Sequence, residues 1–193
     1  VEMEASVEQI EQKEPVQATK MEFYAVSQKK FLIMFLGTFG LYSVYWFYKH
    51  WSLYKKSENE DVWPIMRCIF QIFFTHSLFS LFEMKYQNKT GESPKSINNI
   101  ATIYVVTAIL GNIGSNLAGS GYGVPFTHYS LFMALPISCW CLYQAQSLAN
   151  YASNDVNANS NNKLTLINYI WLVLGLMIWL LNIIGLYLMP IGA

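Results

Sequence analysis

The chain has 193 residues, of which 53% are hydrophobic and only 12% are charged, and its formal net charge at pH 7 is zero. Because a soluble domain usually carries about 25% charged residues, this composition favours an integral membrane protein over a soluble enzyme. The lack of a basic excess argues against nucleic acid as a partner, since proteins that bind it neutralise phosphates with Lys and Arg.

The first 20 residues form a polar, acidic segment with five Glu, two Lys and few large apolar side chains. Such a segment cannot bury enough apolar surface to offset the entropy that it loses on ordering. We therefore predict a mobile N-terminal tail over residues 1–20 and a transmembrane helical domain over residues 21–193. No cleavable signal peptide is expected, because the acidic start lacks a basic patch followed by an apolar run.

Five apolar segments follow the tail. A bilayer core about 30 Å thick takes about 20 helical residues, with a range of roughly 17–25, and the last three segments meet this length. The sequence therefore predicts an all-α fold, a polytopic transmembrane helical bundle with about five apolar segments. These segments are residues 31–48, 63–82, 97–117, 126–148 and 164–189.

The first two segments are predicted to be either straight spans or broken, re-entrant helices. The first is short, and Gly37-Thr38-Phe39-Gly40 within it suits a break between two half-helices. The second begins with Trp63-Pro64, where Pro fits the first position of a helix, and its polar residues change face midway. The sequence leaves both alternatives open.

The lysines predict the orientation in the membrane. The loop over residues 118–125 carries no charge, so we expect it on the side away from the cytoplasm. With five spans and a cytoplasmic N-terminus, only Lys49, Lys55 and Lys56 fall on the outer side. If the first two segments are re-entrant instead, every lysine is cytoplasmic.

Polar residues inside the apolar segments are the candidate functional residues, because a polar group in lipid is costly unless it has a partner. On the fourth segment they recur at steps of three or four and share one helical face. That face favours a ligand or ion path or, more simply, hydrogen bonds between helices. Arg67 in the second segment either finds a distant partner or extends to the headgroups. The candidates are Arg67, Gln71, His76, His128, Cys139, Tyr143, Gln146 and Asn150.

Small and aromatic residues predict where helices pack. The third segment has a face of small residues that allows close approach, and Gly175 between two Trp of the fifth segment predicts a groove for a neighbouring helix. The predicted packing residues are Gly111, Ser115, Trp171, Gly175, Trp179 and Asn182.

We predict no cofactor, no metal and no enzymatic activity. The glycine-rich residues 119–123 lack the preceding strand and the Lys-Ser/Thr that a phosphate-binding loop needs. His76 and His128 lie at different depths in straight spans, which disfavours haem ligation, and no nucleophile with a nearby base is recognisable.

Several motifs together resemble a family of small bacterial multi-pass membrane proteins of unknown function. They are FYAVS at 23–27, TFGLY at 38–42, YWFYKHW at 45–51, the stretch 63–79 that begins with Trp63-Pro64, and NYIW at 168–171. The resemblance implies a multi-pass protein of the bacterial cytoplasmic (inner) membrane and supplies no activity.

The leading hypothesis is a non-enzymatic accessory or scaffold subunit of a membrane complex. Such a subunit packs in the lipid bilayer against other membrane protein subunits or against itself. The alternative is a small transporter or lipid-interacting membrane protein that uses Arg67 and the polar face of the fourth segment.

Overall fold

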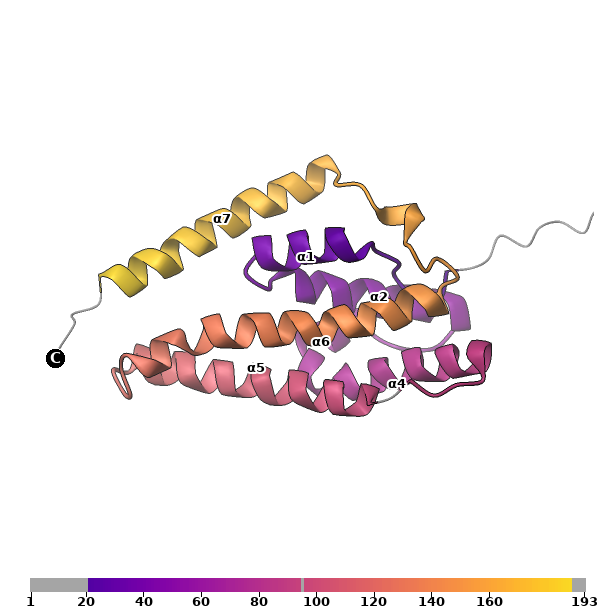
Figure 1. Cartoon of the computed structure of the whole chain (residues 1–193), viewed down its shortest axis with the longest axis horizontal. Helices are drawn as coiled ribbons and strands as arrows, with labels where there is room; N and C mark the ends of the chain where they lie inside the picture. Colours follow the sequence, from indigo (N-terminus) through magenta and orange to yellow (C-terminus); the bar gives the residue numbers. More distant parts are fainter. Residues whose placement is uncertain (1–20, 95, 189–193) are drawn as a thin grey trace, which may run out of the picture.

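The computed structural model describes residues 21–94 and 96–188, which form an all-α fold. Figure 1 shows α5 and α6 running antiparallel along the long axis, α7 diverging from α6, and α1 lying between α6 and α7. The predicted mobile tail, residues 1–20, lies outside the described residues. The helices are α1 (Gln28–Gly37), α2 (Tyr42–Glu58), α3 (Pro64–Ile69), α4 (Gln71–Thr90), α5 (Ile97–Gly119), η1 (Phe126–Tyr129), α6 (Ser130–Ala152), η2 (Asn159–Asn161) and α7 (Leu166–Tyr187).

The first predicted segment is broken into α1 and α2, which form a helical hairpin. Phe39 and Gly40 turn the chain, with φ of 52° and 82°. The Thr38 hydroxyl donates to the Met34 carbonyl at 2.7 Å and accepts from the Tyr42 amide at 3.0 Å. One side chain therefore provides a hydrogen-bond partner for a backbone carbonyl at the end of α1 and for a backbone amide at the start of α2. A straight span over residues 31–48 is therefore wrong, and the break is confirmed.

The second predicted segment is also broken. Pro64 begins α3 at the position that the sequence predicts, but α3 has only 6 residues. Phe70, with φ of −96° and ψ of 37°, interrupts the helix before α4 continues the chain. A straight span over residues 63–82 is therefore wrong as well.

The last three predicted segments are long helices, α5, α6 and α7, with bounds close to those predicted. Of the described helices, α5 and α7 are long and apolar enough to cross a membrane. A bundle of five spans thus stays a prediction. The α5 helix packs closely on α6, since a Cβ added at Gly111 would lie 3.0 Å from the Ala134 side chain.

The α7 helix lies at the periphery of the fold. Its one buried residue is Gly175, and its apolar side chains are otherwise largely exposed. At its start Thr165 and Asn168 form a capping box: the Thr165 amide donates to Asn168 Oδ1 at 2.9 Å, and the Thr165 side chain accepts from the Asn168 amide. The body of the protein therefore holds α7 only along a narrow line.

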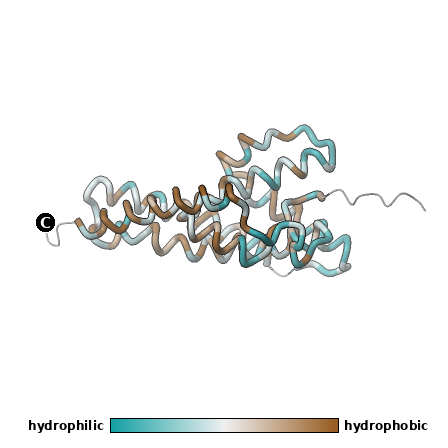
Figure 2. The backbone as a smooth tube through the Cα atoms, turned by 90° about the horizontal axis from the view of Figure 1, so that it is seen from above, coloured by the Kyte–Doolittle hydropathy of each residue, from teal (hydrophilic) through white to brown (hydrophobic). Residues whose placement is uncertain are grey.

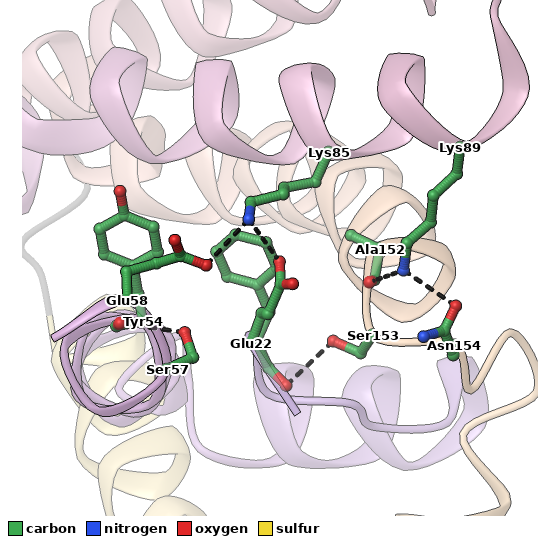
Figure 3. A network of polar contacts seen from close by, with 10 residues as sticks. Glu22, Tyr54, Ser57, Glu58, Lys85, Lys89, Ala152, Ser153 and Asn154 are labelled. Carbon is green, nitrogen blue, oxygen red and sulfur yellow. Dashed lines mark hydrogen bonds and ion pairs between the residues drawn. The ribbon is translucent and has the colours of Figure 1, made fainter. Parts of the chain in front are cut away.

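Charged residues gather at one end of the molecule. Residues 96–154 and 164–188 contain no Asp, Glu, Lys or Arg, and Figure 2 shows hydrophilic residues concentrated at the end away from the C-terminus. There Lys85 pairs with Glu22 at 3.0 Å and with Glu58 at 2.8 Å, while Lys89 bonds to the loop that follows α6 (Figure 3). These contacts connect the end of α2, the end of α4 and the end of α6.

An aromatic core joins α2, α4 and α6 to the extended residues 23–27. Phe23 lies edge-on to Phe82 with ring centroids 4.8 Å apart, and the ring centroids of Trp46 and His50 are 4.2 Å apart. The largest fully buried side chains are Trp46, Trp51, Phe23, Phe31, Phe35, Phe47, Phe79, Phe82, Met34, Leu78, Ile97 and Leu142.

Candidate functional site

Polar side chains of α6 hold the extended segment 23–27 through its backbone. The Val26 amide donates to Asn150 Oδ1 at 3.1 Å, and Asn150 Nδ2 donates to the Val26 carbonyl at 3.0 Å. Gln146 Nε2 donates to the Tyr24 carbonyl at 2.9 Å and to Asn150 Oδ1 at 2.7 Å. Buried backbone groups need such partners, and here α6 supplies them in place of a neighbouring strand.

Three further side chains complete this arrangement. Ser153 Oγ donates to the Phe23 carbonyl at 3.0 Å (Figure 3), and Asn161 Nδ2 donates to the Ala25 carbonyl at 2.9 Å. The Tyr24 amide donates to His50 Nδ1 at 3.3 Å. Segment 23–27 is therefore anchored by α2, α6 and the loop before α7.

His50 acts as a structural hydrogen-bond acceptor. Because Nδ1 accepts from the Tyr24 amide, the neutral ring carries its proton on Nε2. Complete burial lowers the pKa of His50 to about 3, which keeps the ring neutral at physiological pH. The indole nitrogen of Trp46 beside it donates to Gln146 Oε1.

The predicted polar face of the fourth segment does not form one site. Gln146 and Asn150 meet on segment 23–27, whereas His128 lies in η1 at the opposite end of α6, beside a separate cavity of about 300 Å³ that Asn182 also lines. Cys139 is buried in the core, and the Tyr143 carbonyl accepts a hydrogen bond from Gln28.

The candidates of the second segment are also separated from one another. The Arg67 guanidinium lies over the Trp51 ring at 4.1 Å and over the Phe74 ring at 5.1 Å, so aromatic faces are its partners. Gln71 Oε1 accepts from the Tyr104 hydroxyl at 3.2 Å, and the exposed His76 ring lies 3.0 Å from the Thr102 hydroxyl.

The predicted packing residues of α7 face the α1–α2 hairpin. A Cβ added at Gly175 would lie 2.1 Å from the Gly37 carbonyl oxygen, so the two backbones are in direct contact. Trp179 Nε1 donates to the Leu36 carbonyl at 2.8 Å, and its ring lies 4.9 Å from that of Phe39. Of the other predicted packing residues, Asn182 bonds within its own helix, Trp171 lines a cleft, and Ser115 lies half-buried one turn after Gly111.

That cleft is the main candidate site. It has a volume of about 750 Å³ and lies between α1, α2 and the first turns of α7. Its walls are mainly apolar and aromatic, and two lysines, Lys30 and Lys49, reach it. Ligand sites typically have volumes of about 300–1,000 Å³ and combine apolar walls with a few polar groups. The sequence gives no signal for this cleft, because residues 21–68 and 160–171 form it jointly.

Lys30 is the unusual residue of the cleft. It is only 4% exposed, and its ammonium donates to Asn161 Oδ1 and to the Lys163 carbonyl, both at 2.7 Å. Both acceptors are neutral, so neither compensates the positive charge. Burial therefore lowers the pKa of Lys30 below its usual value.

Within the described residues, no group of three or more His, Cys, Asp or Glu side chains could hold a metal ion. Comparison of the chain with family models, curated proteins and solved structures finds no match.

Proposed function

We propose that this chain is an integral membrane protein without a catalytic role that binds a membrane amphiphile in the cleft between the α1–α2 hairpin and α7. In this arrangement α5, α6 and α7 cross the bilayer, and the charged end of the molecule lies on the cytoplasmic side. The hairpin enters the bilayer and returns without crossing it.

The apolar helices support membrane residence. Both α5 and α7 are long and apolar enough to cross a bilayer, and α6 packs antiparallel to α5 within a charge-free stretch, residues 96–154. Large exposed apolar surfaces mark membrane or protein contacts rather than water-facing surfaces. Exposed Leu, Ile, Val and Met side chains occur along the whole of α7.

The hairpin geometry supports a cytoplasmic position for the lysines. The turn at residues 38–41 meets Gly175 in the middle of α7, and Gly40 meets Leu135 of α6. Both α1 and α2 have their other ends at the charged end of the molecule, where Lys30 bonds to Asn161 and Lys85 bonds to Glu58. Lys and Arg favour the cytoplasmic side of the membrane.

The single observation that carries the proposal is the apolar cleft of about 750 Å³ beside α7, whose apolar side chains are largely exposed. A lipid could enter it laterally and exchange contact with the bilayer for contact with aromatic and aliphatic walls.

Photocrosslinking tests the proposal. The full-length protein is reconstituted in vesicles that contain a phospholipid with a diazirine in its acyl chain, and labelled peptides are identified by mass spectrometry. Val44 lines the cleft and Val106 is similarly exposed on α5. We expect Val44→Trp to reduce labelling of peptides from α1 and α2, and Val106→Trp to leave it unchanged. Equal labelling of all exposed apolar surfaces in both variants would contradict lipid binding in the cleft.

A second candidate function, an accessory subunit that packs against another membrane protein, is favoured by the exposed amides of α5. Asn112 and Asn116 are exposed, and Asn116 Nδ2 donates to the Asn112 carbonyl at 2.8 Å and to Asn112 Oδ1 at 3.4 Å. Within the described residues, no other helix provides these side chains with a partner. Exposed amides within a span are costly unless another helix covers them. Purification in mild detergent followed by mass spectrometry tests this function. A stoichiometric partner that Asn112→Leu removes would support it, and a protein that purifies alone would contradict it.

A further inference from the structure

Among the described residues, the cleft contains positive charge without an opposing charge. Lys30 and Lys49 line it, and no Asp or Glu is among its lining residues. In the described part of the chain, the ion pairs join Lys55 to Asp61 and Lys85 to its two glutamates, and none includes a cleft lysine. The ammonium nitrogen of Lys49 lies over the face of the Tyr24 ring, 5.7 Å from the ring centroid.

The two lysines lie at the same level of the hairpin. Lys30 precedes the end of α1 by seven residues, and Lys49 follows the start of α2 by seven residues. At 1.5 Å per residue, each lies about 10 Å from the turn that joins the helices. The cleft therefore has a cationic level toward the charged end of the molecule and an apolar level toward the turn, where Met34, Leu41 and Val44 line it.

The buried ammonium of Lys30 can bind one more acceptor. An ammonium has three donors, and the described residues provide Lys30 with two acceptors, both neutral. A buried charge without a counter-charge is costly. An anionic ligand group in the cleft would remove part of that cost, and Lys49 would add a second charge at the same level.

We propose that the cleft selects an anionic phospholipid, whose phosphate lies between Lys30 and Lys49 and whose acyl chains extend toward the hairpin turn beside α7. This inference rests on the proposed function and adds the charge of the ligand. The cleft is cationic toward the charged end of the molecule and apolar toward the hairpin turn, which matches the order of a lipid headgroup and its chains. A phosphate is favoured because charge-assisted hydrogen bonds to lysine are roughly twice as strong as neutral ones.

The test compares two lipids with identical chains. The full-length, delipidated protein is titrated with dioleoyl phosphatidylglycerol and with dioleoyl phosphatidylcholine in detergent, and bound lipid is measured by native mass spectrometry. We expect the anionic lipid to bind about tenfold more tightly, as the gain of one charged hydrogen bond implies. The variant Lys49→Gln should lose part of this preference, because it removes the second charge while the third donor of Lys30 remains. Lys56→Gln, an exposed position of α2 outside the cleft, is the matched control and should keep it.

Lys49→Gln is the main variant because Lys30→Gln removes contacts to Asn161 and Lys163 and can disturb the loop before α7. Among the described residues Lys49 makes no hydrogen bond or ion pair, so we expect its replacement to preserve the fold. Equal binding of both lipids, reduced by Val44→Trp, would overturn the anionic selectivity while the proposed function stands. A preference that survives both lysine replacements would also overturn it. Binding of neither lipid would refute the proposed function itself.

Discussion

Replacement of Asn150 by Ala tests whether α6 holds the extended segment 23–27. The substitution removes two hydrogen bonds to the backbone of Val26, at 3.1 and 3.0 Å, and one from Gln146 at 2.7 Å. Asn150 is 1% exposed, so water does not replace the lost partner. The Val26 amide and carbonyl are left without partners, while Gln146 keeps its bond to the Tyr24 carbonyl.

The expected cost follows from these two orphaned groups. A buried donor or acceptor without a partner costs about 1–3 kcal/mol, so we expect Asn150→Ala to lower the free energy of unfolding by about 2–6 kcal/mol. For a chain of this size, each kcal/mol lowers the Tm by about 2–4 °C, which predicts a loss on the order of 10 °C.

Thermal unfolding of the detergent-solubilised protein, followed by tryptophan fluorescence, measures the change in Tm. Hydrogen exchange supplies a local readout, because the Val26 amide should exchange faster in the variant. Asn162 is exposed in the loop before α7, and Asn162→Ala serves as the matched control. A Tm loss for Asn150→Ala no larger than that of the control, with Val26 still protected, would refute the anchoring role.

Three further substitutions test other contacts. Gly175→Val places a Cβ at 2.1 Å from an α1 carbonyl oxygen, so the distance between spin labels on α1 and α7 should increase. Gly185→Val is the control, because a Cβ there meets nothing within 4 Å and should leave the distance unchanged. Equal distances in both variants would contradict the contact. Burial lowers the pKa of His50 to about 3, below its unfolded value. The contribution of the neutral His50 ring to the free energy of unfolding is therefore fully present above pH about 6.5, and it falls by about 1.4 kcal/mol per pH unit as the pH drops toward 3. His50→Asn keeps an acceptor but does not titrate, and it should flatten this acid dependence; an unchanged slope would show that other groups cause it. Arg67→Ala removes the cation from the Trp51 ring and should cost about 1 kcal/mol, of which Arg67→Lys recovers part; a Tm equal to that of the parent protein would contradict the stacking.

Local signals in the sequence predicted the helical class and raised a break as one of two alternatives for each of the first two segments. Gly37-Thr38-Phe39-Gly40 indicated a break because glycine allows positive φ and threonine caps helix ends, and the hairpin turn uses both properties. Pro64 indicated the start of α3 for an equally local reason, since its fixed φ suits the first helical position. The bounds of α5 and α7 followed from the length of the apolar runs.

Side-chain partners could not be predicted in the same way. The spacing of Gln146 and Asn150 placed them on one helical face, and hydrogen bonds to a neighbouring helix were the simpler expectation. Their partner is instead the extended segment 23–27, more than 115 residues away in the sequence. Periodicity reports which residues share a face and contains no information about what that face meets.

Local sequence suffices for the helical class and for the long, apolar, charge-free stretches, because capping and hydrophobic length act within about 20 residues. For the first two segments it leaves both a straight span and a break open. Tertiary structure alone decided that Arg67 stacks on Trp51, that α7 contacts the body through Gly175, and that two lysines face one apolar cleft. These contacts join residues from distant parts of the chain, and their formation depends on how the helices pack rather than on any local pattern.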